Sequence, residues 1–251
     1  MQRYYVPDHN WFESEVSLTN EDAHHIIRVM RQQVGDQLIC NHPNGQAAIC
    51  TISEIDDKKV IVQVDEWLEA DNELPINITI VQGLPKGNKL EMIFQKGTEL
   101  GATAFQIFEA DRSIAKWDTK KADSRYKRYH KIIKEASEQC HRNKMPELKQ
   151  VDSLQNIIAS SKGYDHILFG YEEEVNNKEA HTLGKALQQV NLGENILMVI
   201  GPEGGFSKEE VELLKANQAT SVRLGKRILR TETAALYALA SLSYHFEEME
   251  S

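Results

Sequence analysis

The sequence predicts an α/β protein in which a small β-barrel domain precedes a larger domain built on a mostly parallel sheet. Residues 1–72 read mainly as short strands interrupted by one helix, whereas from residue 76 onward apolar strand-like runs alternate with helical segments. Such alternation is typical of a parallel sheet covered by helices. The polar stretch 69–75 ends in a proline and marks the boundary, so the predicted domains are 1–72 and 73–251.

Residues 1–72 carry the turn and strand signals of a small barrel. Asn44–Gly45 is a strong hairpin signal between two apolar runs. A helix is expected after Thr19, which stands three residues before Asp22 at capping-box spacing. Several short strands with one helix favour a β-barrel. The expected strands are 37–40, 47–55 and 60–67, and the apolar stripe of the helix is Ala23, Ile26, Ile27 and Met30.

The larger domain is predicted from apolar runs that alternate with helical stretches. The expected strands are 76–83, 104–110, 165–171, 195–201 and 221–224. A helix with Leu90, Ile93 and Phe94 on one face is expected at 88–101, and a long helix at 124–140. Open α/β sheets bind ligands at the carboxyl ends of their strands, so the loops that follow these strands are the candidate sites.

Charge is unevenly distributed along the chain. The formal net charge of −9 argues weakly against nucleic-acid binding by the chain as a whole. Residues 1–72 hold 5 Lys and Arg against 13 Asp and Glu, whereas residues 112–149 hold 12 Lys and Arg against 5 Asp and Glu. The basic block in the middle of the chain is therefore a candidate for contact with an anionic partner.

The cysteines and the apolar runs favour a cytoplasmic protein. Cys40, Cys50 and Cys140 lack metal-ligand spacing, so no metal is expected, and their wide scatter is typical of reduced thiols. The first ten residues lack the apolar core of a signal peptide. No apolar run approaches the roughly 20 residues that span a bilayer, so no membrane association is expected.

A glycine-rich loop follows the expected strand 195–200. It reads "GPEGG", from Gly201 to Gly205, and Ser207 forms a capping box with Glu210, so a helix begins at about Lys208. The glycines let a ligand approach the main chain at the carboxyl end of a buried strand. The pattern matches neither the dinucleotide nor the P-loop fingerprint, and a tight turn alone explains it equally well.

A second loop runs from Leu224 to Thr231 after the last expected strand. Gly225 ends that strand, and Thr231 is expected to cap a helix that is apolar almost all round. Such a helix is buried in the core or against a partner subunit. Arg230 and Glu232 stand beside the expected ligand site, although a solvated basic turn also explains the cations. The apolar residues are Ala234, Ala235, Leu236, Ala238, Leu239, Ala240 and Leu242.

At these two loops the sequence resembles the RsmE family of ribosomal RNA methyltransferases, within the SPOUT superfamily. The stretches "IGPEGGFSKEE" and "LGKRILRTETA" carry the most specific part of the resemblance. It extends over nearly the whole chain through four further stretches in the same order. These are "HHIIRVMRQQVGDQL", "QGLPKGNKLEMIFQKGTELG", "EADRS" and "EASEQCHRNKMP".

The resemblance implies a PUA-like barrel that helps to hold RNA, an α/β domain with a deep C-terminal trefoil knot, and a homodimer. It implies S-adenosylmethionine as methyl donor. The implied acceptor is the N3 atom of one uridine in 16S, small-subunit ribosomal RNA, either free or in the assembled 30S particle. The knot is implied by the resemblance alone, since local sequence rules argue against knots.

The resemblance also implies a donor pocket made of loops that follow the late strands. Close glycine loops offer main-chain N–H and C=O groups, so an adenine fits there without a phosphate cradle. One wall is expected from Ile200, Gly201, Pro202, Glu203, Gly204 and Gly205, and a second from Leu224, Gly225, Ile228, Leu229, Arg230 and Thr231. A weaker third wall is expected from Leu168, Phe169 and Gly170.

Methylation at a uridine N3 requires loss of the N3 proton, and the charge then spreads to the flanking carbonyl oxygens. A cationic donor aimed at those oxygens stabilises the transition state. The candidate catalytic cations are Arg112, Arg142 and Arg230, and an RNA-phosphate contact or a structural ion pair explains each of them equally well. Glu138 and Glu232 are candidate bases with the same ion-pair alternative.

The long helix 124–140 has a basic face opposite its apolar one. Beside a nucleotide-modifying site, a stripe that follows RNA phosphates explains this face better than solvation alone. The target base is then expected to be splayed from its neighbours. The expected RNA contacts are Lys127, Arg128, Lys131 and Lys134 on the helix, with Arg3, Arg28 and Arg31 in the first domain.

Two other functions remain open from the residues. One is an RNA-binding or ribosome-assembly factor that keeps the fold without catalysis, and calorimetry with S-adenosylmethionine separates it from an enzyme. The other is a SPOUT methyltransferase of ribose 2′-OH groups, which the barrel domain and the stretch "RILRTETA" disfavour by resemblance only.

Overall fold

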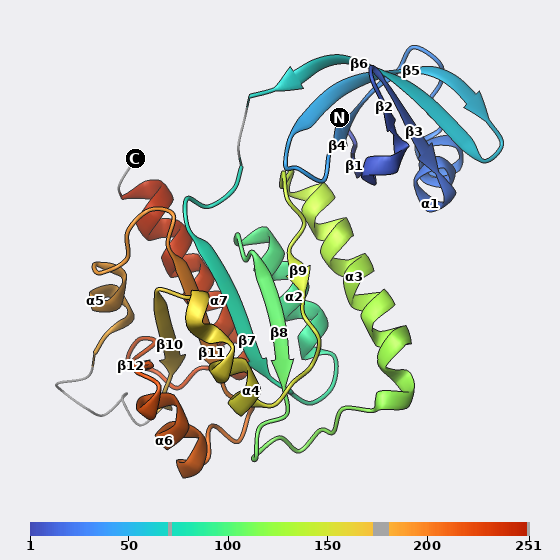
Figure 1. Cartoon of the computed structure of the whole chain (residues 1–251). Coiled ribbons are helices and arrows are strands. Elements are labelled where there is room, and N and C mark those ends of the chain that lie inside the picture. Colours follow the sequence, from blue (N-terminus) through green and yellow to red (C-terminus); the bar gives the residue numbers. More distant parts are fainter. Residues whose placement is uncertain (70–71, 173–180, 250–251) are drawn as a thin grey trace. The chain divides into compact units, whose positions relative to one another are not determined.

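The computed structural model describes residues 1–69, 72–172 and 181–249, and it separates into two compact units (Figure 1). The first unit holds Met1–Glu73 and Lys134–Met145, and the second holds Leu74–Ile133 and Pro146–Ser251. The sequence prediction divided the chain once, after residue 72. Lys134–Met145 joins the first unit because side chains of that unit, such as Arg3 and Asn41, donate hydrogen bonds to the Arg142 carbonyl.

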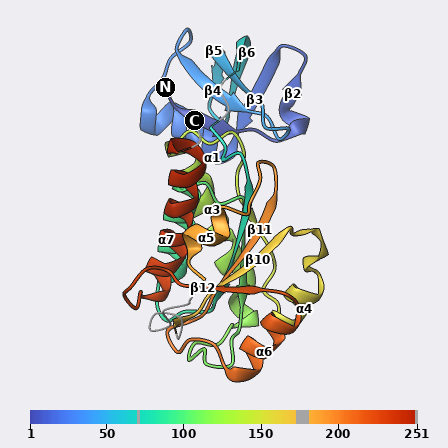
Figure 2. The same ribbon diagram turned by 90° about the vertical axis from the view of Figure 1, so that its left-hand side faces the viewer.

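The first unit is a six-stranded sheet that curls around one apolar core (Figures 1 and 2). Its strands are β1 (Arg3–Tyr5), β2 (Trp11–Phe12), β3 (Glu15–Thr19), β4 (Gln37–Asn41), β5 (Ala47–Asp56) and β6 (Lys59–Leu68). The strand order is β1-β4-β5-β6-β3-β2, and only the pair β1 and β4 is parallel. Ala48, Cys50 and Ile52 of β5 are buried at every second position, as the strand period requires.

The helix of the first unit is less regular than the sequence predicts. α1 (Asn20–His24) continues as a π-helical segment, His25–Met30. The Thr19 hydroxyl makes no capping bond and accepts a hydrogen bond from the Asn20 side-chain amide at 3.3 Å. Asn20 itself has a left-handed φ of 55°. The predicted capping box is therefore wrong, and Met30 of the predicted apolar stripe is exposed.

The second unit is a parallel sheet with helices on both faces (Figures 1 and 2). Its elements are β7 (Asn77–Gly83), α2 (Lys89–Glu99), β8 (Ala104–Phe108), α3 (Ala122–Gln139, of which the last turns belong to the first unit), β9 (Glu147–Leu148), α4 (Leu154–Ala159), β10 (His166–Gly170), α5 (Leu183–Leu187), β11 (Asn195–Ile200), α6 (Lys208–Ala216), β12 (Thr220–Val222) and α7 (Thr231–Ser243), with a π-helical segment at Tyr244–Glu248. The strand order is β12-β10-β11-β7-β8-β9, and every neighbouring pair is parallel. The predicted α/β sheet is thus confirmed.

Side chains of the central strand β11 alternate between the two faces of the sheet. Ile196 and Met198 pack into the core that includes α2, α5 and α7, whereas Leu197 and Val199 pack into the core that includes α4 and α6. All four are at most 1% exposed. A strand that is apolar at consecutive positions is therefore buried on both sides, as the sequence predicts.

The two predicted helix caps have different outcomes. The capping box at α6 is confirmed, because Ser207 Oγ accepts from the Glu210 N–H at 3.1 Å and the Glu210 carboxylate accepts from the Ser207 N–H at 2.7 Å. The predicted cap at Thr231 is wrong: α7 begins at Thr231, and Arg230 takes the N-cap position without a side-chain bond. The Thr231 hydroxyl is engaged in the site described below.

α7 buries one face rather than its whole circumference. Ala235, Ala238, Leu239 and Leu242 are at most 1% exposed, whereas Tyr237 on another side is 38% exposed. The helix packs against α2 and β11. Among the described residues, no helix combines the length and the apolar content that crossing a membrane requires.

Candidate active site

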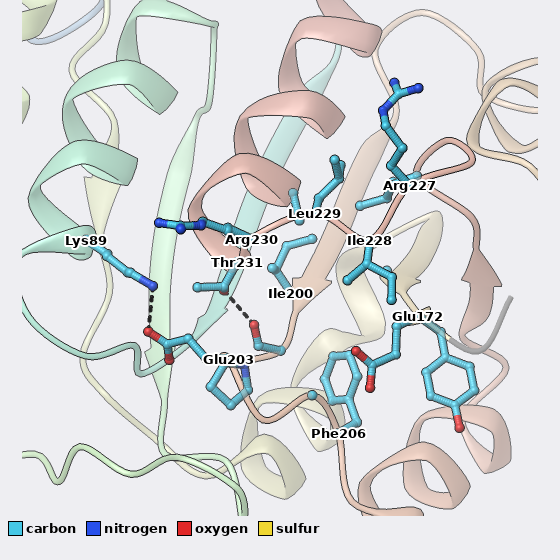
Figure 3. Close-up of a pocket in the computed structure, with 17 residues that line it drawn as sticks. Lys89, Glu172, Ile200, Glu203, Phe206, Arg227, Ile228, Leu229, Arg230 and Thr231 are labelled. Atoms are coloured by element: carbon cyan, nitrogen blue, oxygen red, sulfur yellow. Dashed lines mark hydrogen bonds and ion pairs between the residues drawn. The ribbon is translucent and has the colours of Figure 1, made fainter. Parts of the chain in front are cut away.

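A cavity of about 330 Å³ lies at the carboxyl ends of β10 and β11 (Figure 3). Small-molecule sites commonly have volumes of about 300–1,000 Å³. Its walls come from the loops after β10, β11 and β12 and from the first turns of α2 and α7. The lining residues are Lys89, Gly170, Tyr171, Glu172, Ile200, Gly201, Pro202, Glu203, Gly205, Phe206, Leu224, Arg227, Ile228, Leu229, Arg230, Thr231 and Ala234.

Glycines let the loop after β11 lie close to its neighbours. A Cβ atom on Gly83, the last residue of β7, would stand 2.6 Å from Pro202 Cδ and 2.7 Å from Pro202 N. Gly205 has a φ of 68°, a left-handed conformation that strains other residues. The backbone of this loop therefore forms one wall of the cavity, in a position that the tip of β7 sets.

The Thr231 hydroxyl joins the start of α7 to two strand tips. It donates to the Gly201 carbonyl oxygen at 2.6 Å and accepts from Gln82 Nε2 at 2.8 Å. Thr231 is 5% exposed and Gln82 is 1% exposed, so water does not replace these bonds. The second loop is thereby tied to the first at the edge of the cavity.

Replacement of Thr231 by valine is expected to weaken binding of S-adenosylmethionine about tenfold or more. Valine keeps the shape but leaves two buried polar groups without this partner, at about 1–3 kcal/mol each. Calorimetric titration with the donor measures the effect. Thr231→Ser keeps the hydroxyl and should retain most of the affinity. An unchanged affinity in the valine variant would show that this tie does not shape the cavity.

The cavity has an apolar part and charged groups around it (Figure 3). The apolar lining includes Ile200, Phe206, Leu224, Ile228, Leu229 and Ala234. The charged lining consists of Lys89, Glu172, Glu203, Arg227 and Arg230. This composition fits S-adenosylmethionine, because an adenine requires an apolar slot beside main-chain groups and a methionine moiety requires charged partners. Among the described residues, no group of three or more His, Cys, Asp or Glu side chains is placed to hold a metal ion.

Lys89, Glu203 and Glu232 form an ion cluster at the edge of the cavity. Lys89 Nζ lies 2.8 Å from Glu203 Oε1 and 3.2 Å from Glu232 Oε2. The hydrogen bond to Glu203 raises the pKa of Lys89 despite partial desolvation. Burial acts to raise the pKa of Glu203, but hydrogen bonds from Lys89 and from the Lys86 backbone N–H outweigh it, and this pKa is lowered. Lys89 and Glu203 are therefore both charged at neutral pH.

Most of the residues predicted to bind the donor line the cavity. These are Gly170, Ile200, Gly201, Pro202, Glu203, Gly205, Leu224, Ile228, Leu229, Arg230 and Thr231. Leu168 and Phe169 do not line it, because they are buried within the sheet. Gly204 faces Arg112, where a Cβ atom would stand 2.9 Å from Arg112 Cβ, and Gly225 faces Tyr237. Neither glycine lines the cavity.

The sequence does not predict the remaining lining residues, which are Lys89, Tyr171, Glu172, Phe206, Arg227 and Ala234. Lys89 follows β7, and β7 pairs with β11 in register, so the tip of β7 lies beside the glycine loop. The sequence does not reveal the order of strands in a sheet. It therefore carries no signal that Lys89 lines the cavity. Phe206, Arg227 and Ala234 adjoin predicted positions, so widening each predicted stretch would have found them.

The three predicted catalytic cations have different surroundings. Arg230 is exposed at the cavity, and Arg112 is exposed with Nη1 donating to the Gly204 carbonyl oxygen at 3.3 Å. Arg142 belongs to the first unit and is 3% exposed. Its Nε and Nη2 donate to both carboxylate oxygens of Glu73 at 2.5–3.0 Å. Arg142 was predicted to act in catalysis, to contact an RNA phosphate or to form a structural ion pair, and the structure shows the ion pair.

The basic face of α3 is exposed over part of its length. Lys127, Arg128 and Lys131 are exposed, and Arg128 Nη2 lies 2.8 Å from Glu91 Oε2 of α2. The apolar side of the helix packs into the core through Tyr129 and Ile133. The predicted division of this helix into a basic and a buried face is therefore present in the structure.

The basic spot predicted for the first unit is smaller than expected. Arg28 and Arg31 are exposed. Arg3 is 5% exposed, and its Nη1 donates to the Arg142 carbonyl at 3.1 Å and to Asn143 Oδ1 at 2.9 Å. The prediction that Arg3 belongs to a surface spot is wrong, because its guanidinium is used to hold the chain at residues 142–143.

Lys134, predicted as an RNA contact, lies in an ion cluster of the first unit. Its Nζ stands 2.5 Å from Asp22 Oδ1 and 3.7 Å from Glu138 Oε1. Burial raises the pKa of Glu138 to about 7; the Lys134 charge opposes this rise and the Asp22 charge adds to it. The lysine charge is thus already balanced by two carboxyl groups within the unit.

Glu138 is expected to make the stability of the protein depend on pH. Its folded-state pKa of about 7 lies above the ordinary value of 4.5, so the folded state binds the extra proton. The resulting stabilisation is complete below about pH 4.5 and is lost as the pH rises through 7. Its full size is about 3 kcal/mol, since each pKa unit corresponds to about 1.4 kcal/mol.

Glu138→Gln mimics the protonated form and removes this dependence. Denaturant unfolding between pH 5 and 8 measures the difference between variant and wild type. The two proteins should have similar stability at pH 5, and the variant should be the more stable one at pH 8. Parallel curves across this range would contradict the raised pKa.

Two family models match the chain. An RNA methyltransferase domain matches residues 72–243, and an RNA methyltransferase PUA domain matches residues 18–65. The first match covers the whole sheet of the second unit and all the residues that line the cavity. The second falls within the first unit and covers its helix and most of its curled sheet.

Named relatives resemble the chain over nearly its full length. The ribosomal RNA small subunit methyltransferase E of Bacillus subtilis is 43% identical, over 98% of this chain and 98% of the relative. The protein of the same name from Synechocystis is 32% identical, over 96% of this chain and 77% of the relative. The crystal structure of the enzyme of that name from Neisseria gonorrhoeae, bound to S-adenosyl methionine, has a TM-score of 0.85 at 26% identity and covers 98% of each chain.

Proposed function

This chain belongs to the ribosomal RNA small subunit methyltransferase E family, and we propose from that premise that it methylates the N3 atom of one uridine in 16S ribosomal RNA with S-adenosylmethionine as donor. The observation that carries the proposal is the cavity at the tips of β10 and β11. It combines a glycine loop, an apolar slot and a charged edge in the part of the chain that the methyltransferase family model covers.

The chain contributes alignment and charge to the reaction. S-adenosylmethionine, when bound, supplies a methyl group on a positively charged sulfur. The loop 201–205 and the segment 224–231 hold the donor in place, so that the acceptor base needs only to be aligned with the methyl group. Arg230 lines the cavity, and Arg112 lies against the glycine loop. Their guanidinium groups are proposed to bind the acceptor nucleotide.

The exposed cations are proposed to position the RNA. Lys127, Arg128 and Lys131 of α3 supply one group of phosphate contacts, and Arg28 and Arg31 of the PUA-like unit supply another. Phosphate contacts fix the register of an RNA without reading its sequence. The uridine is proposed to leave its stack to reach the methyl group, as bases do in other enzymes that modify them.

A homodimer is proposed from the exposed side of the C-terminal helix. Tyr237 is 38% exposed, Tyr244 is 61% exposed and Met249 is 63% exposed. Exposed apolar and aromatic side chains that follow one helix favour a partner surface. Sedimentation velocity at micromolar concentration distinguishes a dimer from a monomer.

A trefoil knot in the C-terminal part of the second unit is also proposed, as the family resemblance implies. Supporting it, the segment after β12 returns to the tips of β7 and β11, where Thr231 bonds to Gln82 and Gly201.

Action on ribosomal RNA further favours a cytoplasmic location for the protein.

The proposed function is tested by methylation in vitro. The purified protein is incubated with S-adenosylmethionine and either free 16S RNA or 30S particles, and nuclease digests are analysed by mass spectrometry. N3-methyluridine at one position is the expected product. A 2′-O-methylated nucleoside would instead show a ribose methyltransferase. No donor binding in calorimetry, with RNA binding retained, would show an assembly factor without catalysis.

A further inference from the structure

Lys89 is a cation of the cavity that is held from two directions. Glu203, in the loop after β11, holds it at 2.8 Å, and Glu232, in the first turn of α7, holds it at 3.2 Å. The Lys89 side chain is 28% exposed, and the residue itself starts α2. Three elements that are distant in the sequence therefore fix this one ammonium group at the cavity.

An ammonium group has three N–H donors: one donates to Glu203 Oε1, and the side toward Glu232 Oε2, 3.2 Å away, forms an ion pair without hydrogen-bond geometry. Among the described residues, Lys89 has no third acceptor. Because Lys89 also lines the cavity, the third donor is available to a molecule that enters it. Figure 3 shows the charged ends of Lys89 and Arg230 together at the left of the view, with Arg227 and Glu172 at the right.

We propose that Lys89 is a catalytic residue of the methyl transfer, donating its third N–H to a carbonyl oxygen of the acceptor uracil and stabilising the uracil anion. This inference rests on the proposed function and adds a residue to it. It also explains the arrangement of Glu203 and Glu232, here called the clamp. The two carboxylates hold the ammonium in one place before the substrate binds. A donor fixed in advance needs no reorganisation as charge develops on the substrate.

The chemistry requires such a group. The N3 proton of the uracil leaves to solvent, and the negative charge spreads over N3 and the two flanking carbonyl oxygens. The N3 lone pair then forms the bond to the methyl carbon while the carbon–sulfur bond breaks, and that electron pair stays on sulfur. A fixed cation beside a carbonyl oxygen lowers the free energy of the anion, more strongly in a cavity than in water.

The ion cluster is suited to stabilising an anion rather than to removing a proton. Hydrogen bonds from Lys89 and Lys86 lower the pKa of Glu203 in spite of its burial, which makes it a weak base. Glu232 is 8% exposed, faces the same ammonium and is not among the residues that line the cavity. Of the three groups, Lys89 and Glu203 line the cavity, and the ammonium is the one that donates hydrogen bonds.

The test compares Lys89→Met with wild type and with Lys96→Met. Methionine keeps most of the side-chain volume and removes the charge. Lys96 lies on the same helix and pairs with Glu99 at the surface, so its replacement controls for loss of a lysine on α2. Single-turnover methylation of 16S RNA is expected to be slower by ~10²–10³-fold in Lys89→Met, as for loss of one charge-stabilising donor. Lys96→Met is expected to match wild type.

Two further readouts separate catalysis from a structural clamp. Donor affinity, measured by calorimetry, should fall much less than the rate does in Lys89→Met, because the two loops supply most of the contacts to the methyl donor. The rate of the variant should also keep rising with pH above the range where wild type levels off, since the free N3–H must be ionised without help. RNA that contains 5-fluorouridine, whose N3–H is more acidic, should restore part of the lost rate.

The outcomes distinguish this inference from the proposed function. If wild type forms N3-methyluridine while Lys89→Met keeps its rate, Lys89 has no catalytic part. A slow variant with proportionally weaker donor binding, an unshifted pH profile and no rescue by 5-fluorouridine would show a clamp only. If wild type itself forms no N3-methyluridine, the proposed function fails first, and the role of Lys89 fails with it.

Discussion

Replacement of Arg142 by methionine is expected to lower the free energy of unfolding by about 3–5 kcal/mol, the usual effect of leaving one member of a buried ion pair alone. Arg142 is 4% exposed in its side chain and Glu73 is 10% exposed. The pKa of Glu73 is lowered because hydrogen bonds from Arg142 and from the backbone at 143 and 144 outweigh its burial. Without the guanidinium, that carboxylate is buried without its counter-charge. Denaturant unfolding at pH 7 measures the loss.

The double variant Glu73→Leu with Arg142→Met tests whether Arg142 only stabilises the fold through its ion pair or also takes part in catalysis. Replacing both charges by apolar side chains removes the unpaired charge and should recover much of the stability. If Arg142 only holds the fold, methylation should recover together with stability. A stable double variant that stays inactive would instead show that Arg142 takes part in catalysis, and an additive loss in the double variant would contradict the ion-pair account.

Replacement of Gly83 by alanine is expected to damage the cavity by displacing its glycine loop. The new Cβ atom would meet Pro202 Cδ at 2.6 Å and Pro202 N at 2.7 Å, and a backbone atom cannot swing aside as a side chain does. The glycine loop must move away from β7. We expect donor affinity to fall by at least about tenfold, which is about 1.4 kcal/mol. Overpacking should also destabilise the fold by about 1–3 kcal/mol.

Gly184→Ala is the matched control for this substitution. Gly184 belongs to α5, and a Cβ atom there would meet no heavy atom within 4 Å. A change from glycine to alanine at such a helical position should leave donor binding intact and stabilise the fold slightly. Calorimetry and unfolding are measured on both variants. Equal donor affinities in Gly83→Ala and Gly184→Ala would show that the close approach of β7 does not position the glycine loop.

The sequence was sufficient for the parts of the fold that depend on local patterns. The apolar run at 195–200 is buried on both faces, and Ser207 and Glu210 form the expected capping box. Local patterns misled where a side chain had a distant partner. Thr231 has the composition of a helix cap, but its hydroxyl bonds to Gly201 and Gln82, which no local rule can foresee.

The candidate site could be predicted where it is continuous in the sequence and not where it is assembled. Most of the two glycine-bearing stretches line the cavity, because each is a single loop at a strand tip. Lys89 was missed because its place depends on β7 lying next to β11. Gly204 shows a further limit: composition marks a loop, but which glycine turns toward the cavity depends on a neighbour such as Arg112.

The hydrogen bond between Gln82 and Thr231 joins residues 149 positions apart. Synthesis must therefore have passed Thr231 before this part of the cavity can form, so a product that ends earlier lacks it. Closing so long a contact is also slow relative to local folding. Because a ligand that binds only the closed cavity stabilises the folded state by mass action, ligand binding favours molecules in which this long-range contact has formed.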